Sequence, residues 1–562
     1  MIERAVAAAL LVLAAAAPAC RRAPAAPPSE AVRAVLEKRI GPAGTDAPVN
    51  CRRDRVCGSD VLARFYRDRA FRPAWVDDGL VLGNARAFLS ALRLVSGDGL
   101  DPSNYHLAAL ESLLEGVDRE VRRRPARVPS EDLADLEMLL TDGFLLCGSH
   151  LVHGEVDPAT LQADWSVKGR AADLAAALEK GLAANDVPGA IEALRPAGPV
   201  YRGLRTLHAE YARRAEAGGW PAFPVGPKLV KGDTDARVGA LRKSLQATGD
   251  LAAADDPGDP DHFDAGLEAA LMSFQSRHGL DPDGVVGADT EAALNVSAAD
   301  RLKQVKANLE RWRWITPDLG DRYILVNTAS FFVWVVEAGR AVLTMEAIVG
   351  RAYLQTPDFS GRLSTVTINP AWNVPQEIAR KDVLPLVQKD PDYLRKNGFR
   401  VFESWSDGAR ELDPAAIDWS RITEDGLSYK FRQDPGPKNA LGELAFIFPN
   451  PFGVYMHDTP ARGLFRRAVR DFSHGCIRLE KALDLAAYLL RDDPDWTEDK
   501  IQEAIDAGET KVVRVPEPVS VHVLYWTAWL GDDGRAQFRE DIYLRDAALV
   551  RALGERAAPP PR

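Results

Sequence analysis

One cysteine has two histidines close to it in the sequence. The run Ser-His-Gly-Cys-Ile-Arg occupies residues 473–478, and His457 lies sixteen positions before its first residue. A free cysteine has a pKa of roughly 8.5 and is mostly protonated at neutral pH, so a thiolate nucleophile needs a nearby base or cation. This spacing therefore makes Cys476 a candidate thiolate nucleophile.

The neighbours of Cys476 suggest how such a reaction is supported. His457 is the expected proton acceptor, and His474 is an alternative base because it also lies close to the thiol. Gly475 permits a tight turn before a helix expected from Leu479 to Arg491. The backbone N–H groups of Gly475 and Cys476 are then candidate donors to an oxyanion.

Two other interpretations of the same residues stay open on spacing alone. A cysteine flanked by histidines is often a buried packing thiol. A zinc site is a second alternative, but His457, His474 and Cys476 supply only three local ligands, and no HExxH or CxxC pattern accompanies them. We therefore expect no metal.

The surrounding sequence predicts a mostly β domain. Strand-like segments rich in Val, Ile and aromatic residues occupy 323–327, 331–337, 342–349 and 364–369, and they resume at 444–448 and 454–457. Residues 376–432 interrupt these strands with helical and irregular sequence. An insertion of this length over a β scaffold is a candidate lid.

Helical sequence precedes the β domain. Apolar residues at helical spacing fill most of 31–223, and three short helices are expected within 224–297. A connecting helix is predicted from Ala299 to Trp314. The segment 519–543 predicts two more strands around the turn 531–534.

The composition limits the classes of partner. The chain has 562 residues, with 70 Lys and Arg against 81 Asp and Glu, giving a formal net charge of -11. A nucleic-acid partner is disfavoured because binding a polyanion requires a cationic face. A content of 46% hydrophobic and 27% charged residues is typical of globular protein.

Several motifs together resemble one enzyme family. The run 473–476 with His457 is similar to the active-site signature of the L,D-transpeptidases of the YkuD fold, which crosslink peptidoglycan. Segments 369–375, 432–442 and 448–460 resemble the large periplasmic branch of that family, in which an insertion caps the catalytic cleft. Residues 232–295 resemble its three-helix peptidoglycan-binding domain, and the N-terminal helical part resembles its scaffold domain. One departure is Arg478, where many members have Asn.

The resemblance implies a reaction and a set of site residues. Cys476 would attack the carbonyl of the third residue of a donor stem peptide, D-alanine would leave, and the amine of an acceptor stem would resolve the thioester into a 3-3 crosslink. No cofactor is expected. Arg478 would orient a substrate carboxylate, and the remaining candidate substrate-binding residues are Ser473, Tyr455 and Asn450. For Tyr455 and Asn450, strand packing and a turn are equally acceptable roles.

Two alternative functions stay open. Water as the acceptor would make the protein an L,D-carboxypeptidase or another cysteine hydrolase of the cell wall. A non-catalytic wall-binding scaffold is a second alternative, against which the presence of His457, Ser473, Gly475 and Cys476 argues. Partners among wall-synthesis proteins are not identified by the sequence.

The N-terminus predicts export. An apolar run from Ala5 to Ala17 has the length of a signal sequence and is followed by Cys20, where a lipid anchor is an alternative to simple secretion. We therefore expect a periplasmic or cell-envelope protein. Cys51 and Cys57 could form a disulfide there. Cys147 is expected to be buried.

The predicted fold is multidomain α+β, with a helical scaffold, a three-helix bundle and a mostly β catalytic domain carrying a partly helical insertion. The expected boundaries are 1–20 for the signal, 21–30 for a Pro-rich tether, 31–223 for the scaffold, 224–297 for the peptidoglycan-binding domain, 298–317 for the connecting helix, 318–515 for the catalytic domain with its insertion at 376–432, and 516–562 for C-terminal strands and a tail.

Overall fold

The computed structural model describes residues 28–41, 50–51, 54–55, 59–77, 80–123, 128–252, 258–316 and 319–555. The predicted signal, Cys20 and most of the predicted tether lie outside these residues. Cys57, and with it the predicted disulfide to Cys51, also lies outside them. The first helix already begins at Pro28, inside the segment expected to be a tether. The mixed α+β fold predicted from the sequence is confirmed.

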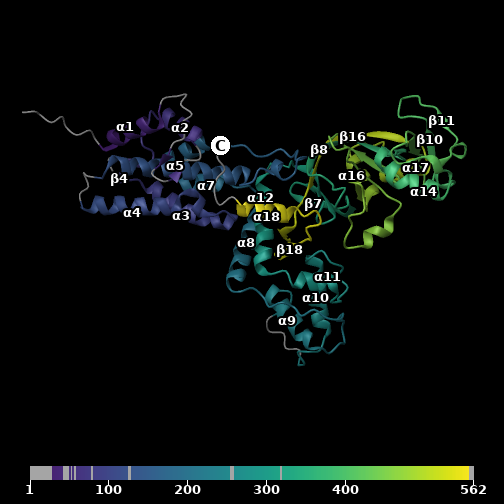
Figure 1. Ribbon diagram of the computed structural model, residues 1–562, viewed down its shortest axis with the longest axis horizontal. Coiled ribbons are helices and arrows are strands. Elements are labelled where there is room, and N and C mark those ends of the chain that lie inside the picture. Colours follow the sequence, from purple (N-terminus) through teal and green to yellow (C-terminus); the bar gives the residue numbers. More distant parts are fainter. Residues whose placement is uncertain are drawn as a thin grey trace, which may run out of the picture.

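The N-terminal domain is a bundle of helices at one end of an elongated molecule (Figure 1). Its central helix α5 is buried along most of its length, and Cys147 on it is fully buried as predicted. The helices are α1 (Pro28–Ile40), α2 (Ser59–Asp68), α3 (Gly83–Leu94), α4 (Leu107–Arg123), α5 (Ser130–His153), α6 (Leu174–Ala183), α7 (Val187–Leu194) and α8 (Pro199–Glu216). Short strand pairs β1 (Asn50–Cys51) with β2 (Asp54–Arg55) and β3 (Val76–Asp77) with β4 (Leu80–Val81) accompany them.

A small three-helix domain follows, with α9 (Ala236–Thr248), α10 (Ala265–Arg277) and α11 (Ala288–Leu294). The carboxylates of Asp235 and Asp264 cap the first two helices by accepting backbone N–H groups, which satisfies donors that a helix start leaves free. A connecting helix α12 (Ala298–Arg313) then packs along α8. Its Trp312 stacks on Trp526 with ring centroids 4.4 Å apart.

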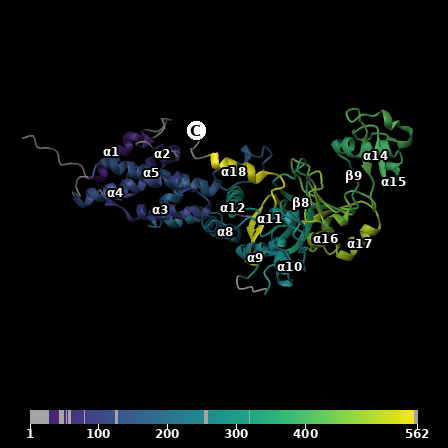
Figure 2. The ribbon, with the colours of Figure 1, turned by 60° about the horizontal axis from the view of Figure 1, so that its bottom comes forward.

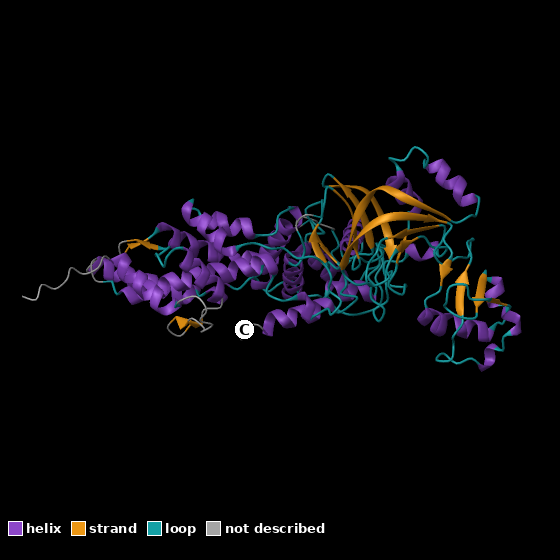
Figure 3. Cartoon of the chain, turned by 90° about the horizontal axis from the view of Figure 1, so that it is seen from above, coloured by secondary structure: helices purple, strands orange, loops and turns teal. Residues whose placement is uncertain are grey.

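The region predicted to be the catalytic domain forms a closed β-barrel (Figure 3). Its strands run in the order β13-β14-β15-β7-β6-β5-β16-β8 around the barrel. Their bounds are β5 (Arg322–Asn327), β6 (Phe332–Glu337), β7 (Arg340–Ile348), β8 (Phe359–Ile368), β13 (Leu444–Ile447), β14 (Met456–His457), β15 (Ile477–Leu479) and β16 (Lys511–Leu524). Buried Val, Ile, Leu and Phe side chains from these strands form one core with helices α16 (Ala482–Leu490) and α17 (Glu498–Asp506).

The insertion between β8 and β13 forms a separate lobe beyond the barrel, at the end of the molecule away from the scaffold (Figure 2). It has its own apolar core and a four-stranded sheet in the order β11-β10-β12-β9, so it contains more strand than the sequence suggested. The elements are β9 (Trp372–Asn373), α13 (Gln376–Ile378), a π-helical turn at Ala379–Val383, α14 (Leu384–Lys389), α15 (Tyr393–Lys396), β10 (Phe399–Phe402), β11 (Glu411–Leu412) and β12 (Lys430–Gln433). We call residues 376–432 the capping insertion.

The C-terminal segment contributes the last barrel strand, β16, and then forms a hairpin and a helix outside the barrel. The boundary expected after residue 515 falls inside β16, because this strand continues past a bulge between Arg514 and Val519 and pairs with β5 up to Leu524. The hairpin of β17 (Ala528–Leu530) and β18 (Ala536–Phe538) forms around the predicted turn. Helix α18 (Arg545–Glu555), which the sequence analysis did not predict, then packs against α12.

Candidate active site

Cys476 lies in the sharp turn that leads into β15. Gly475 before it has a φ of +110°, a conformation that L side chains rarely adopt and glycine adopts easily. The helix expected from Leu479 to Arg491 is present as α16, but its predicted start is wrong, because α16 begins only at Ala482. Ile477 and Leu479 are buried strand residues that pair with β14 and β7. The candidate nucleophile therefore sits at the start of a barrel strand.

The side chain of Ser473 stabilises this turn through two hydrogen bonds. Its hydroxyl donates to the carbonyl of Cys476 at 2.6 Å and accepts the N–H of Gly475 at 3.1 Å. The side chain is buried, and its backbone bonds to Val349 and Arg351. Ser473 thus holds the loop, and the N–H of Gly475 is already occupied rather than free for an oxyanion.

His457 lies on the strand next to the thiol. Strands β14 and β15 are parallel, and His457 pairs in register with Arg478, two residues beyond Cys476. The imidazole Nδ1–H donates to the carbonyl of Asp458 at 2.5 Å, which leaves the lone pair on Nε2 as the proton acceptor. Among the described residues no hydrogen bond joins Cys476 to His457, and the thiol lies 4.0 Å from the carbonyl of Gly453.

Burial keeps both groups neutral at rest. Burial raises the pKa of the Cys476 thiol, and the Tyr455 backbone and hydroxyl together with the Arg478 charge oppose this shift only in part. Burial and the nearby Arg478 charge lower the pKa of His457 to about 4, although the backbone carbonyls of Asp458 and Leu441 act to raise this pKa. A neutral imidazole can accept the thiol proton during attack.

Tyr455 and Arg478 border the thiol. The Tyr455 ring lies 5.6 Å from the His457 ring, and burial and the neighbouring thiol raise the pKa of its hydroxyl. Burial lowers the pKa of the Arg478 guanidinium, as does the charge of Arg351 nearby. Within the described part of the chain, Arg478 has no ion pair with a carboxylate, and its Nε is buried without a hydrogen bond. Such a guanidinium suits a carboxylate brought by a ligand.

His474, the alternative base, faces the capping insertion. Its Nε2 lies 2.9 Å from Oδ2 of Asp382, which belongs to the π-helical turn of the insertion. Asp382 is not predictable from the sequence, because nothing in the local pattern of 376–390 links it to a histidine 92 residues later. The contact ties the insertion directly to the turn that carries Cys476.

Asn450 has a local role. Its amide donates to the carbonyls of Phe448 and Val454, and its carbonyl accepts the N–H groups of Phe452 and Val454. The side chain thereby shapes the loop whose Gly453 carbonyl approaches the thiol. All its hydrogen-bonding groups are used, which fits the turn role that the sequence left open.

The described residues contain no cluster of three or more His, Cys, Asp or Glu side chains that could hold a metal ion. No helix among them is both long and apolar enough to cross a membrane.

Comparison with known families identifies the three domains. Residues 321–513 match the family model described as "L,D-transpeptidase catalytic domain" (YkuD), residues 60–207 match "Scaffold domain", and residues 234–294 match "Putative peptidoglycan binding domain". The chain therefore combines an L,D-transpeptidase catalytic domain with a scaffold domain and a putative peptidoglycan-binding domain.

A relative from Haemophilus influenzae, named "Putative L,D-transpeptidase", is 33% identical over 247 residues. The match covers 44% of this chain and about half, 49%, of the relative. Among solved structures, an L,D-transpeptidase from Mycobacterium smegmatis is 13% identical with a TM-score of 0.17, over 36% of this chain and 58% of that one. L,D-transpeptidase 3 from Mycobacterium tuberculosis is 14% identical with a TM-score of 0.18, over 36% and 61% of the two chains.

Proposed function

We propose that the protein forms 3-3 crosslinks in peptidoglycan through a thioester on Cys476. The observation that supports the proposal is the parallel pairing of β14 and β15, because His457 on β14 lies on the strand adjacent to the one that follows the glycine turn of Cys476, within an L,D-transpeptidase domain. Domains of this kind support peptidoglycan as the substrate and the cell envelope as the place of action.

The proposed reaction has two halves. Cys476 sulfur attacks the carbonyl carbon of the third residue of a donor stem while His457 Nε2 takes the thiol proton. The bond to D-alanine then breaks, and the departing amine receives that proton. In the second half the side-chain amine of an acceptor stem attacks the thioester, giving an amide and restoring the thiol. Arg478 is the proposed partner of a stem carboxylate.

The test incubates the purified protein with a disaccharide-tetrapeptide and follows products by mass spectrometry. Wild type is expected to release D-alanine, to carry an acyl adduct on Cys476 and to give a crosslinked dimer. Cys476→Ala is expected to abolish all three, whereas Cys147→Ala, which removes the buried scaffold thiol, retains them. D-alanine release without dimer would establish a carboxypeptidase instead, and turnover by Cys476→Ala would exclude the thiol mechanism.

A further inference from the structure

Thr356 makes a direct contact with the turn that carries Cys476. It lies in the loop between β7 and β8 and its side chain is fully buried. The hydroxyl donates to the carbonyl of Gly475 at 2.9 Å and accepts the N–H of Gly350 at 2.9 Å. A buried hydroxyl with both its partners on the backbone fixes the relative position of these two loops.

This contact sets the direction of a second group. The carbonyl of Gly475 and the N–H of Cys476 belong to one planar trans peptide unit, so they point in opposite directions. Holding the carbonyl on Thr356 therefore aims the N–H of Cys476 away from the 350–358 loop. Within the described chain, that N–H has no hydrogen-bond partner, whereas the N–H of Gly475 is bound to Ser473.

Glycine at 475 makes such a restraint necessary. A residue without Cβ rotates its peptide planes at low cost, and no backbone ladder bond fixes the 475–476 peptide, because β15 begins only at Ile477. Without the Thr356 hydroxyl, the carbonyl could turn and carry the N–H of Cys476 out of place. An oxyanion donor contributes to rate only when it is oriented before the reaction.

Tyr543 in turn fixes Thr356. Its hydroxyl donates to the carbonyl of Gly350 at 2.7 Å and accepts the N–H of Thr356 at 3.3 Å, so it bridges both ends of the loop. Tyr543 comes from the C-terminal segment, outside the 321–513 match to the catalytic domain. The loop therefore depends on a part of the chain that follows the barrel.

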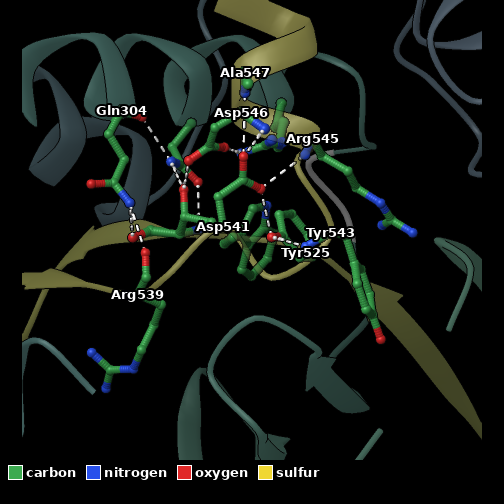
Figure 4. A network of polar contacts seen from close by, with 12 residues as sticks. Gln304, Tyr525, Arg539, Asp541, Tyr543, Arg545, Asp546 and Ala547 are labelled. Atoms are coloured by element: carbon green, nitrogen blue, oxygen red, sulfur yellow. Dashed lines mark hydrogen bonds and ion pairs between the residues drawn. The ribbon is translucent and has the colours of Figure 1, made fainter. Parts of the chain in front are cut away.

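The C-terminal segment is itself held in place by a polar network (Figure 4). The rings of Tyr525 and Tyr543 stack at 5.4 Å, and the Tyr525 hydroxyl donates to Asp541 at 2.7 Å. Arg545 lies over both rings and pairs with Asp358 of the same loop at 2.9 Å. Asp546 pairs with Arg311 of the connecting helix α12 at 2.5 Å. Contacts thus run from α12 to the turn at Gly475.

We propose that Thr356 is a positioning residue that aims the Cys476 N–H at the oxyanion, and that Tyr543 of the C-terminal segment holds Thr356 in register. The inference rests on the proposed function in taking Cys476 as an acyl-accepting nucleophile.

The experiment compares two reactions of Cys476 in the full-length protein. Acetylation by p-nitrophenyl acetate passes through a tetrahedral oxyanion: sulfur bonds to the acetyl carbon and p-nitrophenolate leaves. Alkylation by iodoacetamide displaces iodide and forms no oxyanion. Thr356→Val, which keeps the shape and removes the hydroxyl, is expected to slow acetylation about 10- to 100-fold. Alkylation of Cys476, followed by peptide mapping, is expected to stay within about twofold.

Two further variants serve as controls. Thr356→Ser restores a hydroxyl and is expected to recover most of the acetylation rate, and Tyr543→Phe is expected to reduce acetylation selectively but by less. Equal loss in both reactions would mean that Thr356 only holds the thiol in place, and an unchanged acetylation rate in Thr356→Val would also overturn the inference. The proposed function is judged separately, by wild-type activity on the disaccharide-tetrapeptide, so either idea can fail without the other.

Discussion

At the scale of single residues, the thiol and the imidazole are a neutral pair. Burial raises the pKa of Cys476 and lowers that of His457 to about 4, so an ion pair is not formed before substrate arrives. The proton must then move during attack on the carbonyl, which makes the identity of the base decisive for the rate.

The two histidines should differ in their effect on acylation. His457→Gln is expected to slow formation of the acyl-enzyme about 10²- to 10⁴-fold, because it removes the proton acceptor. His474→Gln is the matched control and should cost less than about tenfold, since its ring nitrogen pairs with Asp382. Single-turnover acylation by a tetrapeptide stem, measured by mass spectrometry, checks both. A larger loss in His474→Gln would reverse the assignment.

Local sequence motifs revealed part of this site and could not reveal the rest. The cysteine, its glycine and both histidines are visible because the reacting groups lie within twenty residues. Thr356 lies 119 residues before its partner Gly475, and Tyr543 lies 187 residues after its partner Thr356. Both side chains bind backbone groups, which leave no pattern in the sequence. Asn450 and Ser473 are predicted as substrate-binding residues because the sequence does not distinguish a polar residue that binds a ligand from one that stabilises a loop.

At the scale of elements, the capping insertion contacts the active-site turn through Asp382 and His474. The insertion has its own core and sheet, and Figure 2 shows it as a lobe that projects from the barrel. We expect the Asp382 contact to act as a latch that limits movement of the insertion relative to the turn.

Weakening this latch should affect substrate binding more than chemistry. Asp382→Asn is expected to change KM for the donor stem by several-fold while kcat changes less than twofold, because a polar contact between partly exposed groups contributes about 0.2–1 kcal/mol even when both are charged. Asp390→Asn is the matched control, since Asp390 pairs with Lys396 inside the insertion. Steady-state kinetics and hydrogen exchange of 376–390 provide the measurements. Identical behaviour of the two variants would argue against a latch.

Helices with their own periodicity are predicted correctly from the sequence, whereas a strand defined by distant pairing is not. The connecting helix and the three-helix domain were predicted from their own periodicity, and both are confirmed. The predicted helix starts too early, at Leu479, because this residue precedes an apolar helical run without a turn residue between them. Only pairing with β14 and β7, which are distant in sequence, makes Ile477 and Leu479 a strand.

At the scale of the whole molecule, histidines with lowered pKa values occur in all three domains. Burial lowers the pKa of His208 in the scaffold to about 4, with Lys306 and Arg313 nearby, and lowers that of His278 on the three-helix domain. In the barrel, His457 and His522 shift in the same direction. In each case the folded protein resists protonation that the unfolded chain accepts.

Stability should therefore fall in mild acid. In the unfolded state each of these histidines binds a proton below its ordinary pKa of 6.5. In the folded state His208 and His457 bind it only near pH 4, so stability is lost as the pH falls from 6.5 toward 4. A shift of this size at the buried His457 corresponds to about 3 kcal/mol at its full extent. Differential scanning calorimetry at pH 7.5, 6 and 5 should show unfolding transitions at progressively lower temperatures. Constant transition temperatures over this range would contradict the prediction.

The closure of the barrel determines the order in which the protein can fold. Its first strand, β5, pairs in parallel with its last, β16, across nearly 200 residues of chain. Contacts between such distant segments form slowly because a long loop must close first. The main core of the scaffold, whose buried apolar residues lie between Val32 and Leu194, can form early. Because β16 ends at Leu524, the barrel can close only after these residues have been synthesised, later than the core of the scaffold.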